Sequence, residues 1–191
     1  MKLNVDTRTM ADLIKGAGYE HGRFECETED GYLVNIDRIT NKSAFNVILF
    51  VHGVLDSAQT WVVHGREKSA AYLAHRCGFD VFMGNFRGVY PRKLAPWKAQ
   101  STVSYWNYNI DDLGKYDIAA FVKKIIEVKV QEMKAIIKAS GIDSYENDME
   151  TPHMSEIEAQ LRAKIKITYV GHSMGGMTLP IYIIHSNMAG K

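Results

Sequence analysis

The sequence contains few cysteines, no excess of charge of either sign and no long hydrophobic run. Two cysteines among 191 residues, Cys26 and Cys77, are too few for a disulfide-stabilised scaffold, and we expect both to be buried thiols. Lysine and arginine total 23 and aspartate and glutamate total 22. The resulting net charge of +1 does not indicate a partner such as nucleic acid or an anionic membrane. The spacing of cysteine and histidine predicts no zinc site and no other metal.

Long apolar segments are also missing. Residues 1–22 contain no continuous apolar block, so the sequence predicts no signal peptide. The longest apolar runs, Val47–Val51 and Thr178–Ile184, are far shorter than the roughly 20 residues of a membrane-spanning helix. Apolar residues nevertheless make up 46% of the chain. Length and composition therefore predict one domain with a buried core, over residues 1–191.

Strand and helix patterns alternate along the chain, which predicts an α/β fold with a mostly parallel sheet. The dipeptide Asp30-Gly31 joins two β-prone runs and is typical of a hairpin turn. Short, wholly apolar runs indicate strands buried on both faces. The expected strands are Phe24–Thr28, Tyr32–Ile39, Val47–Val51, Phe79–Met83 and Ile165–Val170. The expected helices are Arg66–Cys77, burying Ala70, Leu73, Ala74 and Cys77, a long helix from about Asp112 to Ile137, and Met174–Asn187.

One segment, Ala139–Ile157, differs in composition from the rest. It contains five acidic residues and no lysine or arginine, which predicts an acidic surface insertion; a partner-binding loop is the alternative. Ser155 and Glu158 then form a capping-box pattern, and Ile157, Leu161 and Ile165 follow at helical spacing.

The strongest chemical signal is Gly171-His172-Ser173-Met174-Gly175, a G-x-S-x-G pattern between an expected strand and an expected helix. This context is that of a nucleophile elbow, in which a strained turn projects the serine hydroxyl off the sheet. Side chains at positions 171 and 175 would collide in so tight a turn, which explains the glycines. The pattern therefore predicts Ser173 as a nucleophile; a glycine-rich turn with an incidental serine is the alternative.

A second element supports this prediction. His52-Gly53-Val54-Leu55 directly follows the buried strand Val47–Val51. In hydrolases of this architecture, the equivalent loop and the residue after the nucleophile supply the backbone N–H groups of the oxyanion hole. We therefore expect the amides of Val54 and Met174 to bind the oxyanion. His52 and His172 are interpreted as structural rather than catalytic.

Several further motifs resemble the acid lipase family, which includes the lysosomal acid and gastric lipases. They are Gly18-Tyr19-Glu20, Glu27–Tyr32, His52–Ser57, Gly84–Gly88, Tyr105-Trp106 with Asp111-Asp112, and Lys115-Tyr116-Asp117. The resemblance covers about Met10–Val128 and Ile165–Asn187. It implies an α/β-hydrolase fold, hydrolysis of triacylglycerols or steryl esters at a lipid–water interface, and a lysosomal or secreted location. It also implies Ser173 as nucleophile, Val54 and Met174 as oxyanion donors, and no metal or organic cofactor.

The sequence departs from the family pattern at a few positions. Family members usually have a polar residue, often glutamine, where this chain has Met174. Pro180 lies inside the expected nucleophile helix, where it would remove one hydrogen bond and kink the helix. Arg87 lies in a family motif, and we interpret it as part of a buried structural ion pair rather than as a substrate contact.

The general base that a serine nucleophile needs is not apparent. In this fold the partners follow the nucleophile in the order Ser, Asp or Glu, His, yet the 18 residues after Ser173 include one histidine, His185, and no carboxylate side chain. His185 would lie ~18 Å further along the same helix. We therefore expect a partial α/β-hydrolase domain without the lid and the Asp and His strands, inactive by itself. The alternative is a non-catalytic module that binds a lipid or a partner.

Overall fold

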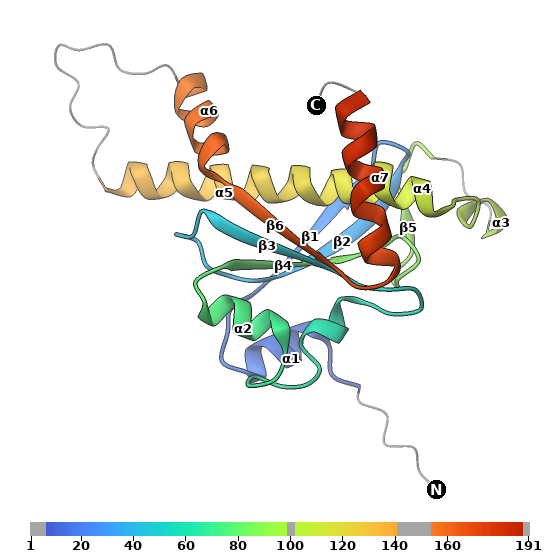
Figure 1. Ribbon diagram of the computed structural model, residues 1–191, viewed down its shortest axis with the longest axis horizontal. Helices are drawn as coiled ribbons and strands as arrows, with labels where there is room; N and C mark the ends of the chain where they lie inside the picture. The colour runs from blue at the N-terminus through green and yellow to red at the C-terminus, as the bar shows by residue number, and fades with distance from the viewer. Residues whose placement is uncertain (1–6, 99–101, 141–153, 189–191) are drawn as a thin grey trace, which may run out of the picture.

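The computed structural model describes residues 7–98, 102–140 and 154–188, which contain one six-stranded sheet (Figure 1). β1 pairs antiparallel with β2, β2 pairs antiparallel with β4 and β5, and β3 pairs parallel with β4 and β6. Among these strands only β2 opposes the common direction, which confirms a mostly parallel sheet with an N-terminal hairpin. The main path runs through β1 (His21–Glu27), β2 (Tyr32–Ile39), β4 (Asp80–Asn85), β3 (Asn46–Val51) and β6 (Lys166–Gly171), with β5 (Lys93–Leu94) off it.

Helices cover both faces of this sheet (Figure 1). α1 (Met10–Gly16), the 3₁₀ turn η1 (Ala58–Trp61) and α2 (Ala70–Arg76) lie on one face, and α5 (Ala119–Ala139) and α7 (Met174–Met188) lie on the other. β3 lies between the two layers. Its alternate side chains belong to two different hydrophobic clusters, Val47, Leu49 and Val51 to one and Ile48 and Phe50 to the other. Burial on both faces explains why this strand is apolar throughout.

The long helix predicted after residue 112 is confirmed, and it begins slightly earlier. After α3 (Thr102–Tyr105), a short helix α4 (Ile110–Asp112), a π-helical segment η2 (Leu113–Ile118) and α5 follow one another without a break. The Asn109 side chain accepts hydrogen bonds from the amides of Asp111 and Asp112, which fixes the start. α5 buries Phe121 and Ile125 in the cluster that also contains Leu49.

The prediction for α2 is wrong in its start and in its buried face. The helix begins at Ala70, and its buried residues are Ala71 and Tyr72. Tyr72 docks on α1, where its hydroxyl donates to the Leu13 carbonyl at 3.0 Å, and this turns Leu73, 55% exposed, toward solvent. In so short a helix, one docked aromatic side chain outweighs the periodicity of the smaller residues. Cys26 is buried as expected, whereas the expectation for Cys77 is wrong, because it lies exposed just after α2.

The acidic segment Ala139–Ile157 lies mostly outside the described residues, and its last part belongs to a helix. α6 (Met154–Lys164) begins one residue before Ser155, so Ser155 is not its N-cap. Leu161 is buried against Val130 and Met133 of α5. Glu158 accepts a hydrogen bond from Lys134 of α5 at 2.7 Å. The predicted helix is confirmed, and it packs on α5.

β6 forms one edge of the described sheet, and β1 forms the other. It pairs with β3 from Asn46–Lys166 to Val51–Gly171, and within the described residues no strand pairs with its other side. It is correspondingly less buried than β3. None of the helices described is both long enough and apolar enough to span a bilayer.

Candidate active site

Ser173 occupies the tight turn between β6 and α7, with a left-handed backbone conformation at φ 52°. The His172 amide donates to the Val51 carbonyl at 3.0 Å, which extends the parallel pairing with β3 up to the turn. The amides of Gly176 and Met177 then donate to the Ser173 carbonyl at 2.9 and 3.2 Å and begin the helix. Non-glycine residues rarely adopt this conformation. The strained strand-to-helix turn expected at Ser173 is therefore present.

The two glycines of the motif are required by close backbone contacts. A Cβ atom at position 171 would lie 2.4 Å from the backbone of Gly175 and 2.5 Å from the Gly176 nitrogen. One at position 175 would lie 2.5 Å from the Val51 carbonyl oxygen and 2.7 Å from that of His52. The obstructing atoms belong to the backbone and have little freedom to move. The predicted steric reason for both glycines is confirmed.

The loop after β3 lies directly against this turn. A Cβ atom at Gly53 would lie 3.2 Å from the Ser173 Cβ and 3.0 Å from the His172 Nδ1. Val54 and Met174 therefore follow two residues that are in contact. Within the described part of the chain, neither the Val54 amide nor the Met174 amide donates to a protein acceptor. Two unpaired N–H groups beside a serine at a helix N-terminus suit stabilisation of a developing negative charge.

His52 is a structural residue, as expected. Its side chain is buried, at 2% exposure, and both ring nitrogens are engaged. Nε2 accepts a hydrogen bond from the Phe86 amide at 3.2 Å, so the proton is on Nδ1, which donates to the Gly53 carbonyl at 2.7 Å. Burial lowers the pKa of His52 and so favours this neutral form. The ring links the ends of β3 and β4 and supports the Gly53 loop.

Among the described residues, no histidine lies within hydrogen-bond distance of the Ser173 hydroxyl. His185, twelve residues further along α7, pairs through Nε2 with both carboxylate oxygens of Asp111 at 3.1 Å. His172 is exposed beside Gly53. The remaining histidines are His21, which pairs with Asp37, His75, which contacts the Thr40 carbonyl, exposed His64, and His153, which lies outside the described residues.

Arg87 forms the predicted buried ion pair. Its fully buried guanidinium contacts Asp117 through Nε at 2.8 Å and Nη2 at 2.6 Å, and it contacts Asp30 through Nη1 at 2.7 Å. Burial raises the pKa of Asp117 to about 6, although the neighbouring Arg87 charge acts to lower it. The group ties the loop after β4 to the N-terminal hairpin and to η2. Arg87 thus has a structural role.

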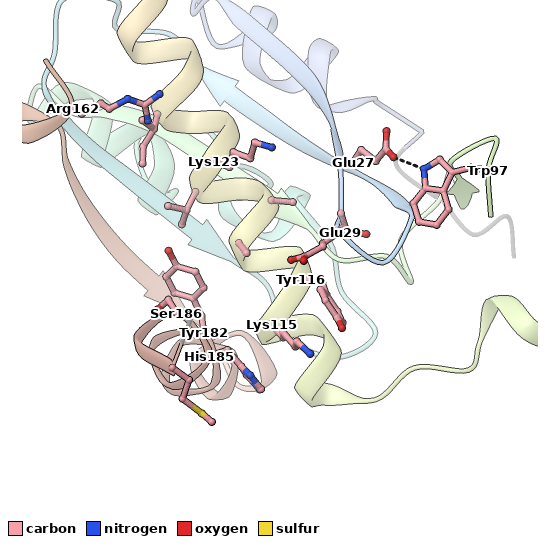
Figure 2. A pocket seen from close by; sticks show the side chains of 16 residues that line it. Glu27, Glu29, Trp97, Lys115, Tyr116, Lys123, Arg162, Tyr182, His185 and Ser186 are labelled. Carbon is pink, nitrogen blue, oxygen red and sulfur yellow. Dashed lines mark hydrogen bonds between the residues drawn. The ribbon is translucent and has the colours of Figure 1, made fainter. Parts of the chain in front are cut away.

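A cleft of about 1020 Å³ opens between η2 and α5 on one side and the C-terminal half of α7 on the other (Figure 2). Lys115, Tyr116 and Lys123 line the first wall and Tyr182 and His185 the second. At one end, the Trp97 indole N–H donates to Glu27 at 2.7 Å (Figure 2). Ser173, Val54 and Met174 do not line this cleft, so it is separate from the elbow.

Two features near the elbow were not predicted from the sequence. Leu55 has a left-handed backbone, with φ 58°, and its side chain is fully exposed next to Val54. The Tyr169 hydroxyl contacts Gly175 and Thr178 beneath the first turn of α7. No local pattern signals the Leu55 conformation. The alternation along β6, which places Tyr169 on the same face as Ile167, is the only sequence signal for the second feature.

Known proteins resemble this chain in sequence over somewhat less than two thirds of its length. A family model described as "Partial alpha/beta-hydrolase lipase region" matches residues 10–65. Gastric triacylglycerol lipase of Homo sapiens is 30% identical over 128 residues, 63% of this chain and 32% of the relative. Lipase lipl-3 of Caenorhabditis elegans is 33% identical over 133 residues, 65% of this chain and 33% of the relative. The chain therefore spans about a third of the length of these curated relatives.

Among solved structures, an esterase of Pyrococcus furiosus aligns with 92% of this chain and 50% of its own, at 16% sequence identity and a TM-score of 0.45. The family model and the sheet topology described above agree on the fold class. The chain has an α/β-hydrolase fold and is similar to the N-terminal portion of the acid lipases.

Proposed function

We propose that this chain carries the nucleophile and the oxyanion hole of a serine ester hydrolase that acts on triacylglycerols or steryl esters. The observation that carries the proposal is the Ser173 turn. Its backbone is strained, its two glycines admit no side chain, and the Gly53 loop packs against the serine Cβ. The similarity to gastric triacylglycerol lipase supports a lipid ester as the substrate.

In this proposal the Ser173 Oγ attacks the carbonyl carbon of the ester as its proton passes to a general base. The carbonyl oxygen becomes an oxyanion, to which the N–H groups of Val54 and Met174 donate hydrogen bonds. When the tetrahedral intermediate collapses, the alcohol leaves with the proton and the acyl group stays on Ser173. Water then attacks the acyl-enzyme by the same route and releases the fatty acid.

The acid and base partners, in this proposal, come from residues outside the present sequence, in the order Asp or Glu and then His. Two observations support this. None of the described histidines forms a hydrogen bond with the Ser173 hydroxyl, and the curated relatives are about three times longer than the part they share with this chain. The 191 residues alone would then be essentially inactive, because loss of the base costs a factor of ~10⁶ in turnover. The same relatives support a secreted or lysosomal location.

Labelling with a fluorophosphonate, which reacts with activated serines, tests the assignment in the full-length protein. We expect the probe to label Ser173 and to label nothing in Ser173→Ala. Ser186→Ala is the matched control, because Ser186 lies near the far end of α7 and its hydroxyl donates to the Ile183 carbonyl at 3.1 Å. Labelling that survives Ser173→Ala would contradict the nucleophile. An unlabelled wild type would favour the non-catalytic module.

A further inference from the structure

The first turn of α7 has a sequence that forms helix poorly. Gly175 and Gly176 are adjacent, and glycine is one of the poorest helix formers. Pro180, which the helix includes, has no N–H to donate to the Gly176 carbonyl. The turn that contains Met174 and follows Ser173 therefore depends on contacts from outside the helix.

Tyr169 of β6 provides such a contact. Its hydroxyl donates to the Gly175 carbonyl at 2.6 Å and lies 3.0 Å from the Thr178 Oγ1, which itself lies 2.9 Å from the same carbonyl. Thr178 is fully buried, and it bonds within its own helix. Tyr169 is the member of the group that reaches the turn from the sheet.

The hydroxyl of Tyr169 is suited to act as a permanent donor. Burial raises its pKa to about 12, so it stays protonated at any physiological pH. The Tyr169 and Thr178 hydroxyls have one proton each, but these two hydroxyls and the Gly175 carbonyl make three contacts. At most two of the three contacts can be hydrogen bonds at one time. The shortest contact, to the Gly175 carbonyl, is the one in which Tyr169 donates.

Gly175 is the residue through which this contact acts on the elbow. Its amide donates to the His172 carbonyl at 2.9 Å. Its backbone also lies close to Gly171 on one side and to the carbonyl oxygens of Val51 and His52 on the other. A shift of the Gly175 peptide would therefore move the adjacent Met174 amide and the Ser173 backbone. The Tyr169 hydroxyl holds the carbonyl end of the Gly175–Gly176 peptide unit, and the N–H end of that unit donates to the Ser173 carbonyl at 2.9 Å. The Ser173 carbonyl in turn belongs to the same peptide unit as the Met174 amide.

We propose that Tyr169, together with Thr178, is a positioning residue that holds the first turn of α7 so that Ser173 and the Met174 amide keep their reactive geometry. The proposal rests on the hydrolase function proposed above. It assigns to a residue outside the G-x-S-x-G motif a role in the rate of acylation, not in substrate binding.

The test is the rate at which the fluorophosphonate labels Ser173 in the full-length protein, well below the melting temperature. We expect Tyr169→Phe to slow labelling about 10- to 100-fold, as a displacement of reacting groups by a fraction of an ångström to 1 Å does. With a lipid ester, kcat should fall by the same factor while KM stays unchanged. Thr178→Ser keeps the hydroxyl and should label at the wild-type rate, whereas Thr178→Val should be slow. The double variant Tyr169→Phe/Thr178→Val should slow labelling by a smaller factor than the product of the factors for the two single variants.

Tyr182→Phe is the matched control. Tyr182 is a half-buried tyrosine of α7, and its hydroxyl has no hydrogen-bond partner among the described residues. It should label at the wild-type rate. A Tyr169→Phe protein that melts earlier but labels at the wild-type rate would overturn the positioning role and leave the hydrolase intact. A wild type that does not label would overturn the hydrolase itself. If Tyr169→Phe does not fold, wild-type labelling by Thr178→Val overturns the proposal.

Discussion

At the scale of single residues, the elbow depends most strictly on Gly171. We predict that Gly171→Ala destabilises the protein by about 1–3 kcal/mol or more and abolishes labelling of Ser173. The reason is that the added methyl group would lie 2.4 Å from the backbone of Gly175, and only a displacement of α7 could relieve the overlap. Urea denaturation gives the first quantity and fluorophosphonate labelling gives the second.

Gly16→Ala is the control for this substitution. Gly16 is the last residue of α1, and a Cβ atom there would have no neighbour within 4 Å. We expect unchanged or slightly increased stability, since alanine is the better helix former. If Gly171→Ala were as stable and as reactive as Gly16→Ala, the close packing between β6 and α7 would be refuted.

The buried charges around Arg87 allow a second prediction at this scale. Asp117→Asn should lower the free energy of unfolding by about 3–5 kcal/mol, because it leaves the buried guanidinium with Asp30 as its only carboxylate partner. Glu25→Gln, which removes the exposed pair with Lys93, should cost no more than about 1 kcal/mol. Equal losses in the two variants, measured by urea denaturation, would contradict the structural role of Arg87.

At the scale of secondary structure elements, features set by a few neighbouring residues could be predicted from the sequence, whereas the buried face of a helix could not. The Asp30-Gly31 turn, the apolar strand Val47–Val51 and the glycines around Ser173 were predictable because each constraint acts within a few residues. The face that α2 buries was not, because Tyr72 docks on α1, a neighbour distant in sequence. The contact between Tyr169 and Gly175 was missed for a similar reason, since it forms only when α7 folds back on β6.

The acidic segment and α6 differ in what they contribute to stability. We expect that replacing residues 141–153 by a short Gly/Ser linker leaves the melting temperature within a few degrees, because loop closure costs only about 0.6 kcal/mol per doubling of length. Leu161→Ala in α6 should instead cost about 2 kcal/mol or more, since Leu161 is buried against Val130 and Met133.

Leu73→Ala is the matched control for Leu161→Ala, because Leu73 lies exposed on α2. It should change stability by no more than about 0.5 kcal/mol. A linker variant that loses soluble expression would show that residues 141–153 pack against the core. A harmless Leu161→Ala would show that α6 contributes little to the fold.

At the scale of the whole molecule, one side of the described sheet ends in β6, an open edge strand. Within the described residues, the second edge of β6 has no partner strand, and Thr168 is exposed on it. Met177 and Ile184 of α7, the helix that follows β6, are more than half exposed. An open edge flanked by apolar side chains favours pairing with another chain. Each side chain left uncovered also forgoes about 1.5–3 kcal/mol of burial, against a typical net stability of about 5–15 kcal/mol.

We therefore predict that the 191-residue chain, purified alone, self-associates and has a low melting temperature. Size-exclusion chromatography and thermal melting measure both properties. Thr168→Lys places a charge on the open edge strand and should shift the population toward monomer, because a lysine on an edge strand opposes strand pairing. Thr7→Lys, a change of the same chemistry at an exposed residue that precedes α1, should leave self-association as it was. A monodisperse monomer with a cooperative melt would contradict the prediction. It would mean that the six described strands suffice to stabilise the turn at Ser173.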